Sequence, residues 1–215
     1  MKDVTNIVFT EFDGYCTYKD KYTAQQHPNA WKTFEDFLLK EKFDLIIEIG
    51  TARGGFTEFL YDFEKENGLG YSLVSFDIND PVNSHIGLMR KGIAIYHINI
   101  FDHENKKIDM DKAWPLLSTP GRKLILCDGG NKISEFNILA NYLNTDDVIM
   151  AHDYAPNWYV FEESYKNQIW NWCEIEDKDI EEISNINSLA PYNYDAFACV
   201  AWVCKICKIS KNKLI

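Results

Sequence analysis

The amino-acid sequence predicts an α/β protein with a doubly wound, mostly parallel β-sheet and helices on both faces. One observation is that short apolar runs of strand length alternate with segments whose apolar residues recur at helical spacing. Such alternation is typical of parallel strands joined by right-handed crossovers. A second observation is that five consecutive predicted strands end in acidic or imidazole side chains, which a parallel sheet gathers at one edge. The chain has 215 residues and no internal boundary, so we expect one domain over 1–215.

The first half of the chain begins this alternation. Residues 1–29 mix aromatic and turn residues, and they predict an N-terminal extension with one short strand. Apolar residues at helical spacing predict two helices, over 30–42 and 55–66. Continuous apolar runs predict three strands, over 45–49, 72–76 and 93–100.

The second half continues the pattern as far as a final strand. Apolar runs predict strands over 123–127 and 148–151, and another within 196–206. Helical spacing predicts a helix over 133–143 and a long polar-aromatic helix over 160–173, followed by an acidic segment over 174–182. Cys204 and Cys207 are three positions apart on the final strand. They should therefore point to opposite faces, which disfavours a redox or zinc site.

Composition limits the partners that this chain can have. Its formal net charge is −11, which disfavours nucleic-acid backbones and anionic membranes. We found no apolar run of transmembrane length, and the first residues lack the apolar segment of a signal peptide. Six cysteines without an export signal favour reduced thiols in a cytoplasm, which would be the host cytoplasm for a viral gene. The expected partner is a small molecule or carbohydrate, and a homo-oligomer is compatible with the sequence.

The most informative segment is the strand 45–49 together with the glycine-rich turn that follows it. The turn carries Glu48, Gly50, Gly54 and Gly55 in the pattern Glu-x-Gly-x-x-x-Gly-Gly. Glycines let the backbone approach a ligand closely, and the next helix offers unpaired N–H groups to a nucleotide-like cofactor. The spacing matches neither the dinucleotide pattern Gly-x-Gly-x-x-Gly nor the phosphate loop Gly-x4-Gly-Lys-Ser/Thr. An ordinary strand-to-helix connection is the alternative interpretation.

This pattern resembles the first motif of class I S-adenosylmethionine-dependent methyltransferases. The resemblance implies that the turn binds S-adenosylmethionine. Asp77 follows Gly55 by 22 residues and ends the next strand, where a carboxylate could accept hydrogen bonds from the ribose diol. Asn99 or Asp102 could meet the adenine amine, although Asp102 could equally be an ordinary turn residue. The predicted cofactor-binding residues are Glu48, Gly50, Thr51, Gly54, Gly55, Asp77, Asn99 and Asp102.

A second predicted site lies at the ends of the fourth and fifth strands. Asp128 and Asp153 end neighbouring strands, and His152 lies beside Asp153. Two converging carboxylates suit a hard divalent cation such as Mg²⁺, which takes oxygen ligands. Such a cation would bind a substrate hydroxyl, lower its pKa and orient its oxygen toward the sulfonium methyl group.

The residues from Gln25 to Tyr154 narrow the resemblance to the cephalosporin hydroxylase family and its macrolide-sugar O-methyltransferase relatives. The similarity is carried by Gln25-Gln26-His27-Pro28, by Trp31 and by the run 43–55. It implies a Rossmann-like fold with a seven-stranded sheet, and it implies that Asp128 and the pair 152–153 hold the metal. The family usually has Glu-Asp where this chain has His152-Asp153. It also often has a histidine base about three residues after the first aspartate, where this chain has Asn131 followed by Lys132.

These departures leave two residues with open roles. His152 is a metal ligand, which would favour manganese, iron or zinc over magnesium, or it is a general base. A structural histidine bonded to a nearby backbone group is the third alternative. Lys132 is the other candidate base, but it would need a lowered pKa to lose its proton. A surface lysine is the simpler interpretation.

The sequence therefore predicts an S-adenosylmethionine-dependent, divalent-metal-assisted O-methyltransferase that acts on a small-molecule or sugar hydroxyl. Aromatic residues after Asp153, especially Tyr154 and Trp158, could line its substrate pocket. One alternative is a non-catalytic binding or assembly protein on the same scaffold, favoured by the missing histidine base. Another is a nicotinamide-dependent oxidoreductase, which the absence of Gly-x-Gly-x-x-Gly disfavours.

Overall fold

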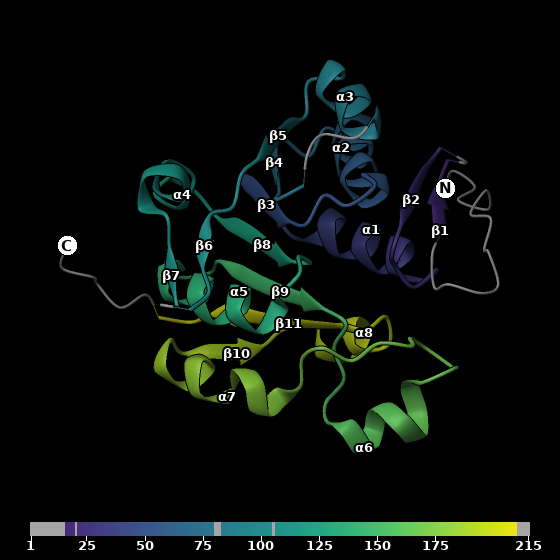
Figure 1. The fold of residues 1–215 in the computed structure, drawn as a ribbon, viewed down its shortest axis with the longest axis vertical. Helices are drawn as coiled ribbons and strands as arrows, with labels where there is room; N and C mark the ends of the chain where they lie inside the picture. Colours follow the sequence, from purple (N-terminus) through teal and green to yellow (C-terminus); the bar gives the residue numbers. More distant parts are fainter. Residues whose placement is uncertain (1–15, 20, 80–82, 105, 210–215) are drawn as a thin grey trace.

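A seven-stranded β-sheet forms the centre of the computed structural model, which describes residues 16–19, 21–79, 83–104 and 106–209 (Figure 1). The strand order is β10-β11-β9-β8-β3-β4-β5. The five strands from β9 to β5 are parallel, and β11 is antiparallel to both of its neighbours. The predicted doubly wound, mostly parallel sheet of seven strands is therefore confirmed.

The elements alternate along the chain as the sequence predicts. The strands of the sheet are β3 (Leu45–Ile49), β4 (Ser72–Asp77), β5 (Ala94–His97), β8 (Lys123–Cys127), β9 (Val148–His152), β10 (Leu189–Pro191) and β11 (Trp202–Cys207). Two small hairpins are formed by β1 (Cys16–Tyr18) with β2 (Tyr22–Ala24), and by β6 (Phe101–Asp102) with β7 (Lys107–Ile108). The helices are α1 (Ala30–Lys40), α2 (Gly55–Asn67), α3 (Asn83–Arg90), α4 (Met110–Leu117), α5 (Lys132–Leu139), α6 (Trp158–Val160), α7 (Asp177–Ile186) and α8 (Tyr194–Ala198).

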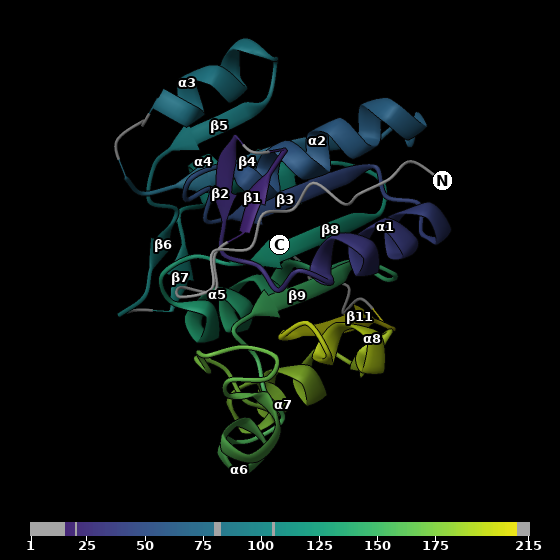
Figure 2. The same ribbon diagram turned by 90° about the vertical axis from the view of Figure 1, so that its right-hand side faces the viewer.

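Helices cover both faces of the sheet, as Figures 1 and 2 show. Helices α1, α2 and α3 contribute to the core on one face, α4, α5 and α7 contribute to the core on the other, and α8 contributes to both. The first core is rich in aromatic rings, with the centroids of Phe34 and Phe56 4.9 Å apart and those of Phe34 and Trp202 5.4 Å apart. Cys204 belongs to the first core and Cys207 to the second, so the two thiols do face opposite sides of the sheet.

Several predicted boundaries are wrong, but those of β3, β4, β8 and β9 are correct to within one residue. In place of the predicted helix over 160–173, the structure has α6 followed by one wide turn of π-helix (Phe161–Tyr165). The helix ends there because Lys166 has an extended ψ and Asn167 has a φ of 61°. The predicted acidic segment becomes α7 from Asp177, where Glu176 and Asp179 form a capping box. The predicted strand 93–100 shortens to β5, and the first part of 196–206 is helical in α8.

The structure also contains elements that the patterns do not predict, namely α3, α4, β10 and the hairpin β6–β7. The predicted N-terminal extension contains two short strands, β1 and β2, and its residues 1–15 lie outside the described part. Gly55 begins α2 directly beneath this hairpin, where a Cβ atom would lie 2.6 Å from the Tyr22 carbonyl oxygen. No helix in the described ranges combines the length and the apolar character needed to cross a membrane.

The turn after β3 touches the turn after β8. Gly50 has a φ of +96°, and a Cβ atom on it would lie 2.2 Å from the carbonyl oxygen of Asp128. The Gly50 N–H donates to the Phe76 carbonyl at 2.8 Å, and the Asp128 N–H donates to the Ile49 carbonyl at 2.9 Å. Only glycine satisfies both the backbone conformation and the close approach at this position.

We expect Gly50→Ala to lower the free energy of unfolding by about 3 kcal/mol or more, because left-handed strain and a steric clash with the Asp128 backbone add together. Gly70→Ala is the matched control. Gly70 likewise has a positive φ, of +85°, but a Cβ atom there meets nothing within 4 Å. We therefore expect its free energy of unfolding to fall by only about 1 kcal/mol. Urea denaturation of both variants measures the difference. Equal losses would contradict the close approach.

Candidate functional site

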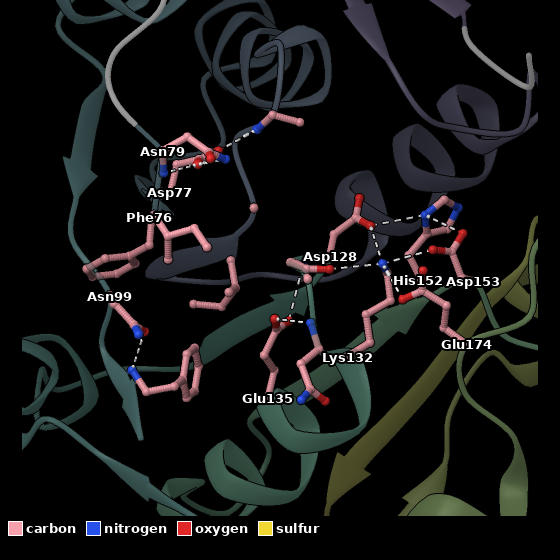
Figure 3. Close-up of a pocket in the computed structure, with 18 of the residues that line it drawn as sticks. Phe76, Asp77, Asn79, Asn99, Asp128, Lys132, Glu135, His152, Asp153 and Glu174 are labelled. Carbon is pink, nitrogen blue, oxygen red and sulfur yellow. Dashed lines mark hydrogen bonds and ion pairs between the residues drawn. The ribbon is translucent and has the colours of Figure 1, made fainter. Parts of the chain in front are cut away.

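A pocket of about 570 Å³ opens at the carboxyl ends of β3, β4, β8 and β9. Its lining divides into two groups of side chains, which Figure 3 shows from one direction. One group surrounds Asp77 and Asn79 after β4. The other surrounds Asp128, His152 and Asp153 after β8 and β9. Open parallel sheets place their ligand sites at this edge, so the position agrees with the prediction from the strand ends.

Asp77 is held rigidly in the first group. One carboxylate oxygen accepts the Ala52 N–H at 2.8 Å, and the other accepts the Asn79 N–H at 2.8 Å and its side-chain amide at 2.9 Å. These bonds connect the turn after β3 to the end of β4, and they fix the direction of a buried carboxylate beside the pocket. Gly50 and Ala52 line the pocket next to it.

Five of the predicted cofactor-binding residues do not line the pocket: Glu48, Thr51, Gly54, Gly55 and Asp102. Glu48 is 1% exposed and accepts hydrogen bonds at 2.6 Å from the hydroxyls of Thr57 and Ser75, so it joins β3 to α2 and β4. Thr51 shares a hydrogen bond of 2.6 Å with Ser75. Gly54, with a φ of +85°, precedes the first residue of α2, where a Cβ atom would meet the Leu88 side chain at 2.5 Å. The first four of these residues stabilise the turn after β3 without lining the pocket.

Burial governs the protonation of Glu48. Desolvation raises its pKa to about 7, although the hydrogen bonds from Ser75 and Thr57 oppose the shift; the charges of Asp128 and Asp77 reinforce it.

Of the two residues predicted to contact the adenine, only Asn99 lies at the pocket. Asn99 lines the pocket, and its side-chain carbonyl accepts the Phe101 N–H at 2.9 Å. Asp102 lies on β6, is exposed and does not line the pocket. Asn79, Phe76 and Ile78 line the same part of the pocket and were missed by the sequence analysis, which followed only strand-end acids and the glycine spacing.

The second group brings the three predicted metal ligands together. One donor atom from each of Asp128, His152 and Asp153 lies within 4.8 Å of the others. The His152 Nδ1 atom is 3.1 Å from Asp128 Oδ1 and 3.4 Å from Asp153 Oδ1. Asp153 has a φ of 56°, which turns the chain away from the sheet directly after β9. Two carboxylates and an imidazole at this spacing fit a divalent cation.

Lys132 is buried at the start of α5, and its ammonium group lies among these carboxylates (Figure 3). Its Nζ atom is 2.8 Å from Asp153 Oδ2, 3.0 Å from Glu174 Oε2 and 4.0 Å from Asp128 Oδ1, and it donates to the Gly129 carbonyl at 3.0 Å. Burial by itself would lower the pKa of Lys132, but the surrounding carboxylates raise it instead. A catalytic base needs the opposite shift. The structure thus opposes the base role for Lys132, and it excludes the surface-lysine interpretation.

His152 is 1% exposed, and its ring stacks on Trp202 with centroids 4.9 Å apart. Desolvation would lower its pKa, but the charges of Asp128 and Asp153 more than offset this effect and raise it. The buried Nε2 atom has no hydrogen-bond partner among the described residues. The alternative of a histidine bonded to backbone is therefore not supported, since Nδ1 faces carboxylates.

Side chains from distant segments hold the two aspartates in place. Gln26, which is fully buried, donates to Asp128 Oδ2 at 2.8 Å and accepts from the Trp202 indole N–H at 2.8 Å. Trp170 donates its indole N–H to Asp153 Oδ1 at 2.5 Å. Gln26 lies inside the run 25–28 that carries the family resemblance, which is the one sequence signal for it. Trp170 has no such signal, because it was assigned to a helix that does not form.

Glu135 on α5 supports the turn after β8 from beneath. Its carboxylate accepts the N–H groups of Gly129 and Asn131, each at 3.1 Å. Burial raises the pKa of Glu135 to about 7, while these hydrogen bonds oppose the shift. The sequence analysis missed this residue.

Comparison with known proteins finds the same fold in solved structures of CmcI. No family model and no curated protein matches the chain. The CmcI structure without ligand matches with a TM-score of 0.63 at 12% identity, covering 96% of this chain and 80% of that chain. A CmcI structure described as Mg-SAM matches with a TM-score of 0.58 at 13% identity, covering 96% and 81%. One described as SAH also gives 0.58, at 12% identity, covering 96% and 87%. The predicted resemblance is confirmed at the level of fold: the chain shares its α/β fold with the CmcI structures.

The raised pKa of Glu48 predicts a specific dependence of stability on pH. Between the ordinary pKa of 4.5 and about 7, the folded protein keeps the Glu48 proton while the unfolded chain releases it. The contribution of Glu48 to stability therefore falls as the pH rises through this range. Relative to wild type, Glu48→Gln should become more stable by on the order of 2 kcal/mol between pH 5 and pH 8.

Urea denaturation of wild type and variant at both pH values measures this change. Glu66→Gln, at an exposed position on α2, controls for the loss of a glutamate charge. A difference between wild type and Glu48→Gln that is the same at both pH values would contradict the assignment.

Proposed function

We propose that this protein transfers a methyl group from S-adenosylmethionine to a hydroxyl group of a small molecule or sugar, assisted by a divalent cation. The observation that carries the proposal is that one pocket joins the Asp77 turn to the cluster of Asp128, His152 and Asp153. The first group suits a ribose and the second suits a cation beside a reacting hydroxyl. A fold shared with CmcI supports the cofactor but does not by itself determine the function.

The proposed cofactor contacts follow from the geometry of the first group. Asp77 would accept hydrogen bonds from the ribose diol, because its direction is already set by Ala52 and Asn79. The turn at Gly50 would lie close to the cofactor, and Asn99, which lines the same pocket, would approach the adenine. Glu48 would act indirectly, as a buried support for this turn.

The proposed cation would be held by Asp128, His152 and Asp153. When bound, a divalent cation would lower the pKa of the acceptor hydroxyl and orient its oxygen toward the methyl group. We assign His152 the ligand role, because its Nδ1 atom lies 3.1 Å from Asp128 Oδ1 and 3.4 Å from Asp153 Oδ1. To bind a cation, Nδ1 would release its proton and its hydrogen bond to Asp128. An imidazole ligand extends the choice from Mg²⁺ to Mn²⁺.

The acceptor would enter between the second group and the segment after the wide turn. Trp172 is 41% exposed and lines the pocket, so its ring offers a surface on which a sugar or aromatic acceptor stacks. Glu174 lines the pocket nearby and could accept a hydrogen bond from a second hydroxyl. Tyr154, predicted as part of this wall, is instead buried and bonded to Asp177, and Trp158 does not line the pocket. The net charge of −11 disfavours nucleic acids and anionic membranes, so we propose that the enzyme acts on small molecules or carbohydrates. Its free cysteines favour a reducing compartment, and we propose the cytoplasm.

Asp77→Asn should weaken S-adenosylmethionine binding by about tenfold or more, because the ribose diol loses a charged acceptor. Binding of Mn²⁺ should change little, since Asp77 belongs to the other group. Isothermal titration of S-adenosylmethionine and of NAD, each with and without a divalent cation, measures both effects. Binding of NAD alone would favour the oxidoreductase alternative, and binding of neither nucleotide would favour a non-catalytic scaffold.

Asp128→Asn should produce the opposite pattern. We expect binding of Mn²⁺ to weaken by about tenfold or more, because a carboxylate ligand is lost, while S-adenosylmethionine binding changes far less. Transfer of a labelled methyl group to a panel of sugars and phenols, measured at a Mn²⁺ concentration that half-saturates the wild-type protein, should fall with the metal affinity. Unchanged metal binding and unchanged transfer would reject the proposed cation site.

A further inference from the structure

We propose that the Lys132 ammonium is the resident cation of the second group, and that a divalent cation binds Asp128 and Asp153 only by displacing it. This inference rests on the proposed cation site and adds a competitor that belongs to the chain itself. The family resemblance implies a metal between the two aspartates. In this structure the same carboxylates form ion pairs with Lys132, at 2.8 Å to Asp153 and 4.0 Å to Asp128.

The hydrogen bonds around Asp128 and Asp153 also support this proposal. Every carboxylate oxygen of Asp128 and Asp153 already has a donor from the chain: His152 and Gln26 on Asp128, Trp170 and Lys132 on Asp153. Gln26 and Trp170 are uncharged and also help to orient the carboxylates for a cation, whereas Lys132 brings a positive charge. A divalent cation within a few ångströms of an ammonium group is strongly repelled in a buried site. The two cations therefore exclude each other.

The position of Lys132 is built into the fold. Lys132 is the first residue of α5, and the Asn131 side chain before it accepts the Ser134 N–H at 3.1 Å. Only 7% of the lysine side chain is exposed, so its stem is packed and its ammonium group is directed inward. The Gly129 carbonyl, 3.0 Å from Nζ, adds an uncharged acceptor. The Lys132 ammonium group is therefore held by the backbone of the turn after β8 as well as by the carboxylates.

Glu174 gives the displaced ammonium a second partner. Its carboxylate is 3.0 Å from Nζ, and 47% of its side chain is exposed, in contrast to the 12% of Asp153. Lys132 can therefore leave the aspartates, keep its ion pair with Glu174 and move toward solvent. Because both states retain a salt bridge, the exchange of ammonium for metal does not leave a buried charge unpaired.

The consequence is that Lys132 lowers the affinity of the second group for divalent cations. We expect Lys132→Met and Lys132→Gln to bind Mn²⁺ at least about tenfold more tightly than wild type, because a competing charge is removed. Glutamine keeps an N–H donor for Asp153, whereas methionine keeps only the packed stem. Lys112→Met is the matched control, since it removes the same charge from an exposed site on α4.

Titration of Mn²⁺, followed by electron paramagnetic resonance of the free ion, measures the affinities without reference to catalysis. The expected result is tighter binding in both Lys132 variants and an unchanged affinity in the control. Folded Lys132 variants that bind Mn²⁺ no more tightly than wild type would overturn the proposal. A gain of the same size in Lys112→Met would also overturn it, because the effect would then be one of overall charge.

A second measurement uses the wild-type protein, in case the variants do not fold. Acetic anhydride labels accessible lysines, and mass spectrometry quantifies the labelling of Lys132 relative to Lys112. We expect Lys132 to be protected without metal and to become labelled as Mn²⁺ saturates the protein. Saturation with Mn²⁺ that leaves Lys132 protected would overturn the proposal. Failure of S-adenosylmethionine to bind would instead reject the proposed function, and it would leave these metal measurements unaffected.

Discussion

The contact between the turns after β3 and β8 is the constraint on which the site depends. The backbone of Gly50 approaches the Asp128 carbonyl so closely that no side chain fits between them. Hydrogen bonds from Gly50 to Phe76 and from Asp128 to Ile49 hold three neighbouring strand ends at the same level. This places the Asp77 turn and the Asp128 cluster along one pocket. A wider separation would leave the two groups in different cavities.

Charge neutralisation is the second principle of this site. One buried and one half-buried aspartate lie beside an imidazole and an ammonium, and each carboxylate oxygen has a donor. An arrangement of this kind stays folded because no buried charge is left without a partner. The donors come from parts of the chain far apart in sequence, including Gln26 before α1 and Trp170 after the wide turn. The cluster is thus a product of the complete fold, and its chemistry depends on which cation the aspartates hold.

The sequence analysis was most successful where a local pattern has a single structural solution. Continuous apolar runs predict β3, β4, β8 and β9 with little error, because strands buried on both faces must be apolar throughout. It failed over 160–173, where aromatic residues at helical spacing suggested a helix. There Trp170 turns inward to donate to Asp153, a contact whose partner lies 17 residues away and leaves no periodic trace. Prediction of β5 was too long because only part of that run pairs with β4.

The sequence by itself determined the fold class, the glycine turn and the identity of the acids at the strand ends, because these depend on residue type and short-range spacing. The tertiary structure decided which of them meet. It directed Glu48 inward, away from the pocket, because Thr57 and Ser75 supply its partners there. It also turned Lys132 from a candidate base into a buried cation, because three carboxylates from separate segments surround its ammonium group. Electrostatic environment depends on distances between residues remote in the chain, and only the folded molecule fixes those distances.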